Sequence, residues 1–443
     1  MKLLSTVFKH FSKYMKMSEI NQKFVLPQRY TGSEPSVWTE YIQLALDYKP
    51  LNLGQGFPDE FPPKYVTDTL VEVAKDRSDY TIHQYARGFG HPRLIKALAK
   101  LYSKLIGRQI NERTEILVCI GGYEALFSAI SGHTDVGDEV IVIEPYFDCY
   151  EPMIKYAGGI PRFIPLRPKE VSGRLLSSAD WVLNKEELES LFNEKTKMII
   201  VNSPNNPLGK VFSMEELTFI ADLCKKWNVL CLSDEVYEWM VFKPHKHIRI
   251  ATLPGMWERT ITIGSGGKTF SVTGWKVGWV YCPENLMKNL HIVHQNSVYT
   301  GVTPVQVATA IAFEIEMERM ESDDCYFVSL ARELEAKRDY MVNFLVDIGM
   351  KPTIPDAGYF MLADWSALES KVDMNSENDK YNDFRFTKWM TKNVGLQGIP
   401  PSAFFSSPNK YLAEHCVRYC YMKKTETLKQ AEDILKQWKA TTK

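Results

Sequence analysis

Short runs of apolar residues recur along the middle of the chain and are separated by stretches of different periodicity. One such stretch, residues 213–227, has apolar positions spaced as on one face of an α-helix. Short unbroken apolar runs that alternate with helices indicate a parallel sheet buried on both faces. The sequence therefore predicts strands at 116–120, 140–143, 198–201, 229–232 and 261–263.

The regions on either side of these strands differ in composition and in the spacing of their apolar residues. Residues 24–65 are rich in proline and glycine, and we expect them to be extended or irregular up to a helix at 64–75. After residue 318, a long predicted helix, an alternating strand pattern at 416–422 and a final helix indicate a smaller α+β unit. We therefore expect an α/β fold with a mostly parallel sheet, divided into an N-terminal arm at 24–45, a large domain at 66–318 and a small domain at 46–65 and 319–443.

The residues that follow the predicted strands are candidates for a site, because ligands of parallel sheets bind at the carboxyl ends of the strands. Each of them also has a plain structural explanation. Gly121 and Gly122 suit a tight turn or an anion at a helix start, and Phe147 suits core packing or a stacked ring. Asn206 belongs to a turn fixed by two prolines, whereas Asp234 directly follows a buried strand and needs a cation.

Lys268 lies in the glycine-rich stretch 260–279, just after the last of these strands. A buried lysine is costly unless a partner uses its charge. The tripeptide Gly-Lys-Thr that contains it is also the end of a P-loop, but that motif needs glycine at position 262, where the chain has Thr262. The five strand ends together favour a site for a flat, charged aldehyde cofactor over nucleotide binding.

Composition excludes several classes of partner. The net charge of −1, from 53 basic and 54 acidic residues, gives no reason to expect nucleic acid or an anionic membrane. No apolar run approaches the ~20 residues that a membrane span requires. Eight cysteines without a CxxC pair predict neither a zinc site nor a disulfide framework, so we expect no metal.

The first 18 residues contain four lysines and no acidic residue, and their apolar positions fall roughly on one helical face. This resembles a mitochondrial transit peptide, although it lacks arginine. We expect residues 1–23 to be a targeting segment or a disordered tail. Starts at Met15 or Met17 would give a cytoplasmic form, so the expected localisation is mitochondrial or cytoplasmic.

Seven motifs occur in order between residue 52 and residue 298: NLGQGFPD (52–59), GGYEALF (121–127), EPYFDCYEPM (144–153), NSPNNPLGKVF (202–212), SDEVYEWM (233–240), PGMWERTITIGSGGKTFSVTGWKVGW (254–279) and HQNSV (294–298). With them the chain resembles the fold-type I pyridoxal-phosphate aminotransferases from about residue 24 to the C-terminus. Within these it looks most like the kynurenine aminotransferase, glutamine transaminase K and cysteine-conjugate β-lyase group.

The resemblance implies a cofactor, pyridoxal 5′-phosphate, and a role for each matched residue. Lys268 would bind the aldehyde covalently and move the proton of the reaction, Asp234 would pair with the pyridine nitrogen, and Tyr237 would hydrogen-bond the phenolate oxygen. The other implied cofactor contacts are Gly122, Tyr123, Phe147, Asn206, Ser265, Lys276 and, from the other subunit of a homodimer with shared sites, Tyr85.

On the substrate side, the resemblance implies that Arg418 pairs with an α-carboxylate, for which the planar guanidinium is suited. The remaining implied substrate contacts are Asn206, Gly56, Trp38, Tyr123 and Tyr299. Two departures from the family matter. Lys276 stands where many relatives have arginine, and Tyr299 with Thr300 stands where some mammalian members have Phe-His, so side-chain preference is expected to differ.

The implied activity is transfer of an amino group from kynurenine, glutamine or another large or aromatic amino acid to a 2-oxo acid. Elimination from cysteine S-conjugates would be a side activity of the same site. The alternatives are a PLP enzyme whose main reaction is C–S elimination, and a non-enzymatic relative. The intact set of Asn206, Asp234, Tyr237, Lys268 and Arg418 argues against the last.

Overall fold

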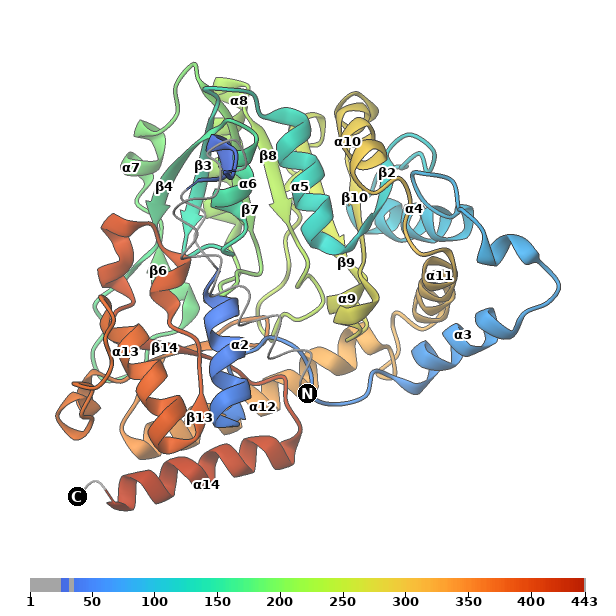
Figure 1. Cartoon of the computed structure of the whole chain (residues 1–443). Helices are drawn as coiled ribbons and strands as arrows, with labels where there is room; N and C mark the ends of the chain where they lie inside the picture. Colours follow the sequence, from blue (N-terminus) through green and yellow to red (C-terminus); the bar gives the residue numbers. More distant parts are fainter. Residues whose placement is uncertain (1–24, 32–35, 442–443) are drawn as a thin grey trace.

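A seven-stranded sheet forms the centre of the molecule (Figure 1). The computed structural model describes residues 25–31 and 36–441, so the targeting segment predicted at 1–23 lies outside the described residues. From edge to edge the strands are β2 (Ile116–Ile120), β10 (Val277–Tyr281), β9 (Thr260–Ser265), β8 (Leu230–Asp234), β7 (Thr196–Asn202), β3 (Glu139–Glu144) and β4 (Ile160–Pro165).

The sheet is parallel apart from one strand. β9, β8, β7, β3 and β4 pair in parallel, whereas β10 is antiparallel to both of its neighbours, β2 and β9. Because β2 and β9 both oppose β10, they run in the same direction. The five predicted strands are therefore confirmed with one shared direction, and the sequence pattern missed β4 and β10.

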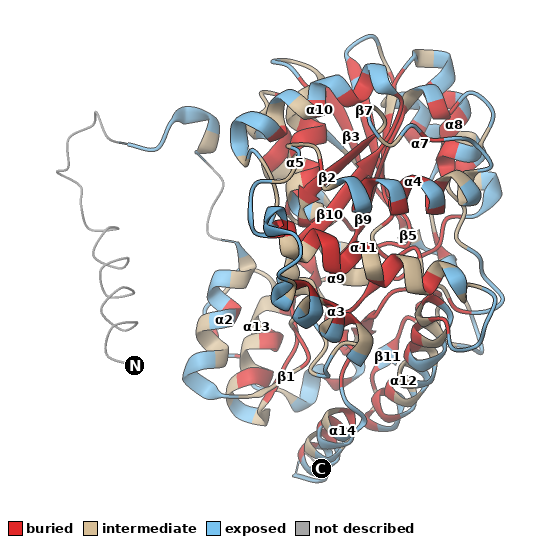
Figure 2. Ribbon diagram, turned by 90° about the vertical axis from the view of Figure 1, so that its right-hand side faces the viewer, coloured by how far each residue is buried: buried red, intermediate tan, exposed pale blue. Residues whose placement is uncertain are grey.

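Helices cover both faces of the sheet, which explains why the strands read as unbroken apolar runs. On one face lie α5 (Gly121–His133), α6 (Tyr150–Tyr156) and α10 (Glu284–Ser297). On the other lie α4 (Pro92–Ile106), α7 (Lys185–Ser190), α8 (Met214–Trp227) and α11 (Thr303–Glu318). Figure 2 shows the strands buried between helices whose outer surfaces are exposed.

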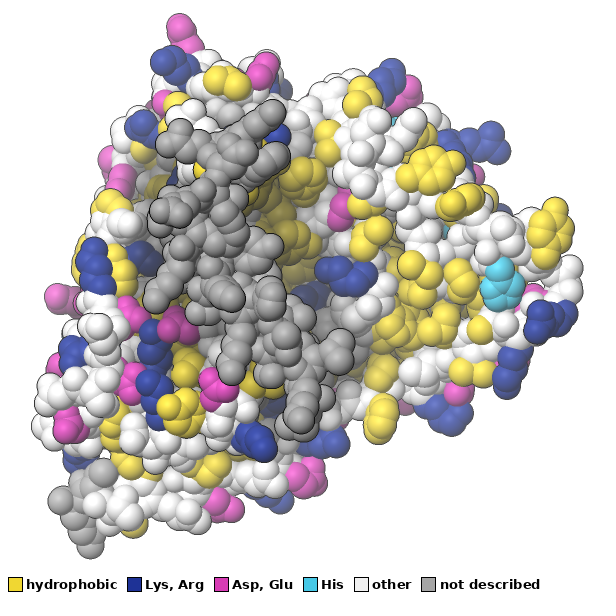
Figure 3. All heavy atoms as spheres, in the orientation of Figure 1, with side chains coloured by type: hydrophobic (Ala, Val, Ile, Leu, Met, Phe, Trp, Pro, Cys, Tyr) yellow, Lys and Arg dark blue, Asp and Glu magenta, His cyan; other side chains and the backbone are white. Residues whose placement is uncertain are grey.

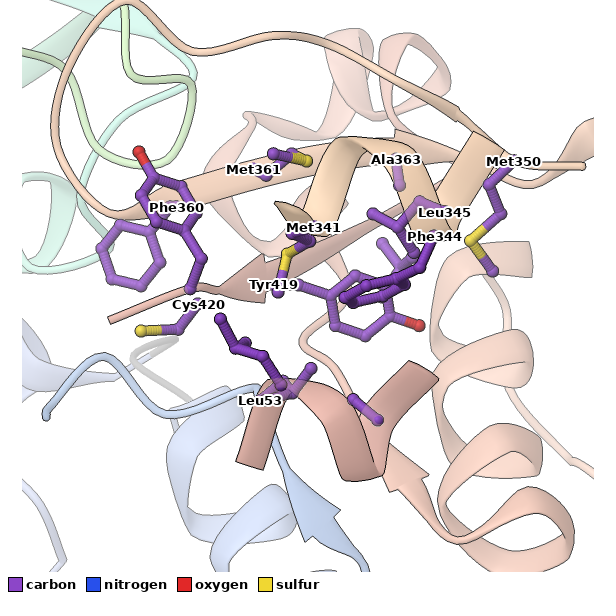
Figure 4. Packing of buried hydrophobic residues seen from close by; sticks show 14 of the residues in the cluster. Leu53, Met341, Phe344, Leu345, Met350, Phe360, Met361, Ala363, Tyr419 and Cys420 are labelled. Carbon is purple, nitrogen blue, oxygen red and sulfur yellow. The ribbon is translucent and has the colours of Figure 1, made fainter. Parts of the chain in front are cut away.

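A second group of elements packs around its own hydrophobic cluster. A small antiparallel sheet of β11 (Lys351–Pro352), β12 (Phe360–Asp364) and β14 (Cys416–Cys420) lies against α12 (Tyr326–Ile348), α13 (Asn382–Trp389) and α14 (Thr425–Thr441). Figure 4 shows Leu53, Met341, Phe344 and Tyr419 converging in this core. Leu53 follows β1 (Leu51–Asn52), which pairs with β13 (Leu396–Gln397), so a segment close to the N-terminus is built into the C-terminal core.

Several shorter elements complete the fold. α3 (Lys64–Lys75) has the predicted bounds, β5 (Arg167–Pro168) pairs with β6 (Trp181–Val182), and the single-turn helix α9 (Gly266–Thr269) follows β9. The prediction that residues 24–65 are extended or irregular is wrong at 37–48, where α2 (Val37–Tyr48) forms. Its N-cap is Ser36, whose side chain accepts a hydrogen bond from the backbone of Trp38.

None of the helices in the described ranges combines the length and apolar character that crossing a bilayer would demand.

Candidate active site

A cavity of about 440 Å³ opens where the sheet's strand ends meet the small-sheet elements. Most of the predicted site residues line it: Trp38, Gly56, Gly122, Tyr123, Phe147, Asn206, Asp234, Tyr237, Ser265, Lys268, Lys276 and Arg418. Tyr85 and Tyr299 do not line it. Parallel strands deliver their carboxyl ends to one edge, which is why residues so far apart in sequence converge here.

Lys268 is carried into this cavity by β9 and α9. Burial lowers the pKa of its ammonium to about 8 from the ordinary 10.5. Its Nζ donates a hydrogen bond of 2.5 Å to the hydroxyl of Tyr359. A buried amine with a pKa near neutrality is suited to act as a base or a nucleophile.

Asp234 is the last residue of β8 and is almost completely buried. Desolvation raises the pKa of its carboxyl to about 6 from 3.8. The Tyr150 hydroxyl donates to its Oδ2 at 2.5 Å, and the backbone N–H of Val236 donates to its Oδ1 at 3.3 Å. In the described part of the chain Asp234 forms no ion pair, so a cationic ring nitrogen would find an unmatched carboxylate here.

A buried charge network anchors the segment that follows Asp234. Glu235 accepts hydrogen bonds from Ser233 at 2.8 Å and contacts His247 Nε2 at 2.7 Å. Glu238 pairs with Arg249 and accepts a bond from the Tyr102 hydroxyl. The two carboxylates and His247 are close enough to suggest a metal site, but the guanidinium of Arg249 already neutralises Glu238. These hydrogen bonds and ion pairs fix the conformation of residues 234–238, which accounts for the cluster without a metal.

The start of α5 forms an anion cradle. The helix begins at Gly121, in a left-handed conformation with φ 74°. No side chain in the described part of the protein caps it, so its first N–H groups are available there to a ligand. Ser265 and Lys276 line the same end of the cavity, and a Cβ placed on Gly121 would lie 3.3 Å from Lys276 Nζ. Helix N–H groups, a hydroxyl and an ammonium are a donor set that fits a phosphate.

Arg418 lies on β14, lines the cavity and is fully buried. Its Nη1 donates to Asn206 Oδ1 at 3.2 Å and its Nη2 to the backbone carbonyl of Gly54 at 2.9 Å, while Nε has no partner among the described residues. Its guanidinium lies 4.0 Å from the ring centroid of Phe360. Burial lowers the pKa of Arg418 to about 10. No carboxylate of the described chain forms an ion pair with it, which leaves its charge for a ligand.

Trp38 is placed by α2 rather than by an irregular arm. Its indole N–H donates to Asp148 Oδ2 at 2.8 Å, and the Arg418 guanidinium lies 5.2 Å from its ring centroid. Tyr123 and Phe147 form another part of the wall, with ring centroids 6.2 Å apart and planes at 89°. The cavity lining thus combines aromatic rings with charged groups, which suits a flat cofactor that carries a phosphate and an amino acid.

Tyr85 and Tyr299 contact each other on the surface instead. Their ring centroids are 5.6 Å apart, and the two residues are 81% and 54% exposed. Within a single chain, therefore, neither residue reaches the cavity, and the predicted contact of Tyr299 with the substrate is not seen there.

Sequence patterns missed three residues that contact the site. Tyr150 binds Asp234, Tyr359 binds Lys268, and Phe360 lies under Arg418. Tyr150 stands within the motif at 144–153, three residues after Phe147, and Tyr359 and Phe360 stand where β12 begins, a strand that no prediction covered. Nothing in the local pattern separates them from core aromatics, because their partners come from other elements.

A larger groove, of about 920 Å³, lies away from these residues. Several of its charged groups are paired with one another, as Lys185 is with Glu215 and Lys210 with Glu216. Among the described residues that line it, no buried acid or base lacks a partner of opposite charge in the way that Asp234 and Lys268 do. The smaller cavity is therefore the candidate active site.

Comparisons with known proteins agree with this geometry. The model of the aminotransferase class I and II family matches residues 48–435. Kynurenine–oxoglutarate transaminase 3 of Homo sapiens is 54% identical over 428 residues, covering 97% of this chain and 93% of that protein. Kynurenine–oxoglutarate transaminase 1 of Homo sapiens is 46% identical over 414 residues, covering 93% of this chain and 98% of that protein.

Solved structures give the same result. Bna3p from Saccharomyces cerevisiae, which carries a provisional assignment as a kynurenine aminotransferase, superposes with a TM-score of 0.87 at 32% identity. The match covers 94% of this chain and 99% of Bna3p. The buried lysine, the carboxylate beside it and the unpaired arginine thus occur in a chain that belongs to the class I and II aminotransferase family, and the protein is a transaminase.

Proposed function

We propose that this protein moves the amino group of kynurenine, glutamine or another large or aromatic amino acid to a 2-oxo acid, with pyridoxal 5′-phosphate as its cofactor. The observation that carries the proposal is the convergence of Lys268, Asp234 and Arg418 in one aromatic-walled cavity. The similarity to kynurenine–oxoglutarate transaminases over nearly the whole chain supports the choice of substrate.

When bound, the cofactor supplies an electron sink for a carbanion formed at the substrate's Cα. The chain's own residues would hold it at three points. The start of α5 with Ser265 and Lys276 would bind its phosphate, Asp234 would pair with its ring nitrogen, and Lys268 would bind its aldehyde carbon. Asn206 and Tyr237 line the cavity between these points and would hydrogen-bond the phenolate oxygen, and Phe147 would stack on the ring.

Arg418 would fix the substrate through its α-carboxylate. Its guanidinium is already oriented by Asn206 and by the Gly54 carbonyl, so little freedom is lost when a carboxylate binds. Lys268 would then move the proton at Cα, because its pKa of about 8 leaves part of it as free amine near neutral pH.

The cavity wall favours large apolar side chains. Trp38, Tyr123, Phe147 and Phe360 contribute aromatic surface. The cationic residues in the lining are Lys268, Lys276 and Arg418, and each already has a role, so the described lining offers no further cation to a substrate's side-chain carboxylate. Aspartate should therefore be a poor donor.

An amino-donor screen against several 2-oxo acids, including ones without a second carboxylate, tests the proposal. We expect kynurenine, glutamine, methionine and phenylalanine to be used at least about tenfold better than aspartate, as judged by kcat/KM. Equal use of aspartate and kynurenine would refute the specificity. Cysteine S-conjugates would be cleaved by the same Lys268 base, and pyruvate release without any 2-oxo acid measures that elimination separately. Elimination faster than transamination would make C–S lysis the main activity.

We also propose that the active form is a homodimer with shared sites. Figure 3 shows hydrophobic side chains gathered on the face over α3 and α11. Val71, Tyr80, Tyr85, Tyr299 and Val302 belong to these elements or lie next to them, and each is exposed in the single chain. A second copy covering this face would bring Tyr85 and Tyr299 toward the cavity of its partner, where the resemblance places a phosphate contact.

For the cellular location we propose mitochondrial and cytoplasmic forms, supported by the basic, acid-free N-terminal 18 residues and by Met15 and Met17 as internal starts. Fractionation of cells that express the tagged full chain, with and without Met1, tests this. Identical distribution of the two would contradict it.

A further inference from the structure

Tyr359 links the candidate base to the segment at 54–57. Its hydroxyl accepts a hydrogen bond of 2.5 Å from Lys268 Nζ and donates one of 2.9 Å to the backbone carbonyl of Gly56. The residue is 1% exposed, and its ring packs edge-on against Tyr237 with centroids 5.3 Å apart. No part of the proposed function uses this hydroxyl.

The direction of both hydrogen bonds is fixed by chemistry. A phenol has one proton, and a backbone carbonyl can only accept, so the proton of Tyr359 points at Gly56. The phenol oxygen is then left to accept from Lys268. Burial raises the pKa of Tyr359 well above its usual value, so the phenol keeps its proton across the working pH range.

The Gly56 carbonyl is a fixed acceptor because the whole segment is tied down. The Gly54 carbonyl accepts from Arg418, and the carbonyls of Gln55 and Phe57 accept from Lys423 at 3.3 Å and 2.8 Å. Tyr359 just before β12, Arg418 on β14 and Lys423 after β14 thus hold the four successive carbonyls of residues 54–57.

We propose that Tyr359 is a positioning residue for the transamination reaction. Its hydroxyl, oriented by the Gly56 carbonyl, accepts a hydrogen bond from the free amine of Lys268 and so holds that amine in place. The proposal rests on the role of Lys268 in the proposed function. Lysine has a long, flexible side chain, and an amine that must return repeatedly to one carbon atom gains rate from being held.

Other groups around Lys268 also set its protonation. Those that influence it from the neighbouring elements are Asp234 on β8, Arg418 and Cys420 on β14, and Lys276 before β10. All of them remain when only the hydroxyl of Tyr359 is removed. A change in the pKa of Lys268 after that removal therefore reports on the hydroxyl and on its contact with Tyr237.

The chain contains a matched control. Tyr421 is also fully buried and its hydroxyl also donates to a glycine carbonyl, that of Gly358, at 2.9 Å. Its hydrogen bonds do not include Lys268. Tyr359→Phe and Tyr421→Phe thus each remove a phenol oxygen and its hydrogen bond to a glycine carbonyl. Only Tyr359→Phe also removes a hydrogen bond to the amine of Lys268.

The first measurement uses the cofactor-free full-length chain. Lys268 is acylated with acetic anhydride between pH 6 and 10, and its modification is followed by peptide mass spectrometry. Losing an acceptor from the ammonium should lower the midpoint of Lys268 in Tyr359→Phe by about one pH unit, and Tyr421→Phe should match the wild type. Unchanged midpoints in both variants, or equal shifts in both, would overturn the proposal.

The second measurement uses the cofactor-loaded enzyme. We expect kcat to fall about tenfold in Tyr359→Phe while KM for the amino acid changes little, because Arg418 is untouched. An unchanged kcat, or a fall of the same size in Tyr421→Phe, would also overturn it. If the wild type itself turned over none of the proposed donors, the proposed function would fail, and the acylation midpoints would still decide the role of Tyr359.

Discussion

Asp234 and Lys268 are buried groups of opposite charge whose pKa values are shifted toward each other. Desolvation is the largest cause in each case, and it brings Asp234 up to about 6 and Lys268 down to about 8. Each charged form is therefore costly in the free protein and becomes favourable only when a ligand pairs with it. The buried charges therefore destabilise the cofactor-free protein, and binding of the cofactor offsets that cost.

We predict that Asp234→Asn stabilises the cofactor-free protein while weakening cofactor binding. Because the folded-state pKa lies above 3.8, the proton on Asp234 stabilises the fold at low pH, and that contribution is lost as pH rises through 6. Urea unfolding should show the variant more stable at pH 8, by up to about 3 kcal/mol, with the advantage shrinking below pH 6.

Asp180 provides the opposite control for this prediction. The guanidinium of Arg174 lowers the pKa of Asp180, so its ionised form stabilises the fold above its unfolded pKa. Asp180→Asn should therefore destabilise the protein at pH 8. An Asp234→Asn variant that is less stable than wild type at pH 8 would contradict the prediction.

For Arg418→Gln we predict a loss of substrate binding with the cofactor still bound. The variant lacks the charge that would meet the α-carboxylate, so KM for the amino acid should rise and kcat/KM should fall by an amount equivalent to about 3–5 kcal/mol. Cofactor absorbance measures retention, and steady-state kinetics measure the loss. Arg174→Gln, at the surface, is the control, and an unchanged KM in Arg418→Gln would refute the carboxylate role.

Site residues are predictable from the sequence where their chemistry coincides with the end of a predicted strand. Asp234 and Lys268 each follow a predicted strand, so their convergence follows from the parallel sheet alone. Tyr150 and Tyr359 could not be found this way. Their hydroxyls meet Asp234 and Lys268 across 84 and 91 residues of chain, and only the packing of separate elements decides that contact.

At the scale of elements, the close approach of β10 to the start of α5 shapes the anion cradle. A Cβ on Gly278 would lie 2.4 Å from the backbone carbon of Gly121 and 2.6 Å from the nitrogen of Gly122. Both neighbours are backbone atoms and cannot move aside independently. The glycine in β10 thus sets where the N–H groups of α5 stand.

We predict that Gly278→Ala weakens cofactor affinity through this contact. The helix start must shift, which should cost about 1–3 kcal/mol of stability and raise the Kd for pyridoxal 5′-phosphate about tenfold. Gly274→Ala in the same stretch is the control, because its added Cβ would meet no atom of residues 25–31 and 36–441 within 4 Å. Fluorescence titration of the cofactor-free proteins distinguishes them, and equal Kd values would contradict the prediction.

The elements that the pattern missed show what a local pattern lacks. β10 is short and contains Gly278, so its apolar run is a weak strand signal in the sequence. In the structure it is hydrogen-bonded on both sides, to β2 and to β9. α2 follows a proline-rich segment, and its helix is stabilised by contacts of Tyr41 with Ile399 and Phe404 from the far end of the chain. In both cases tertiary pairing outweighs local propensity.

At the scale of the whole molecule, the exposed pair of Tyr85 and Tyr299 is unusual for a single chain. Tyr299 stands in the segment that follows α10, and its ring contacts that of Tyr85. His294, within α10, is fully buried. His294 contacts the Gly88 carbonyl at 2.8 Å and Glu124 at 3.2 Å, so the loop bearing Tyr85 is fixed to α5. A rigid, exposed aromatic pair of this kind is suited to insertion into a second copy.

Complementation between two defective chains tests this arrangement. Lys268→Ala removes the base from a chain's own cavity, whereas Tyr85→Glu would place a carboxylate against the phosphate in the partner's cavity. In a mixed dimer the cavity of the Tyr85→Glu chain keeps its own Lys268 and receives an intact Tyr85, so that site is whole. Random reassociation of equal amounts should therefore restore about a quarter of wild-type activity, although each variant alone is nearly inactive. Absence of recovery, with mixed dimers verified by mass spectrometry, would show that Tyr85 does not serve the partner's site.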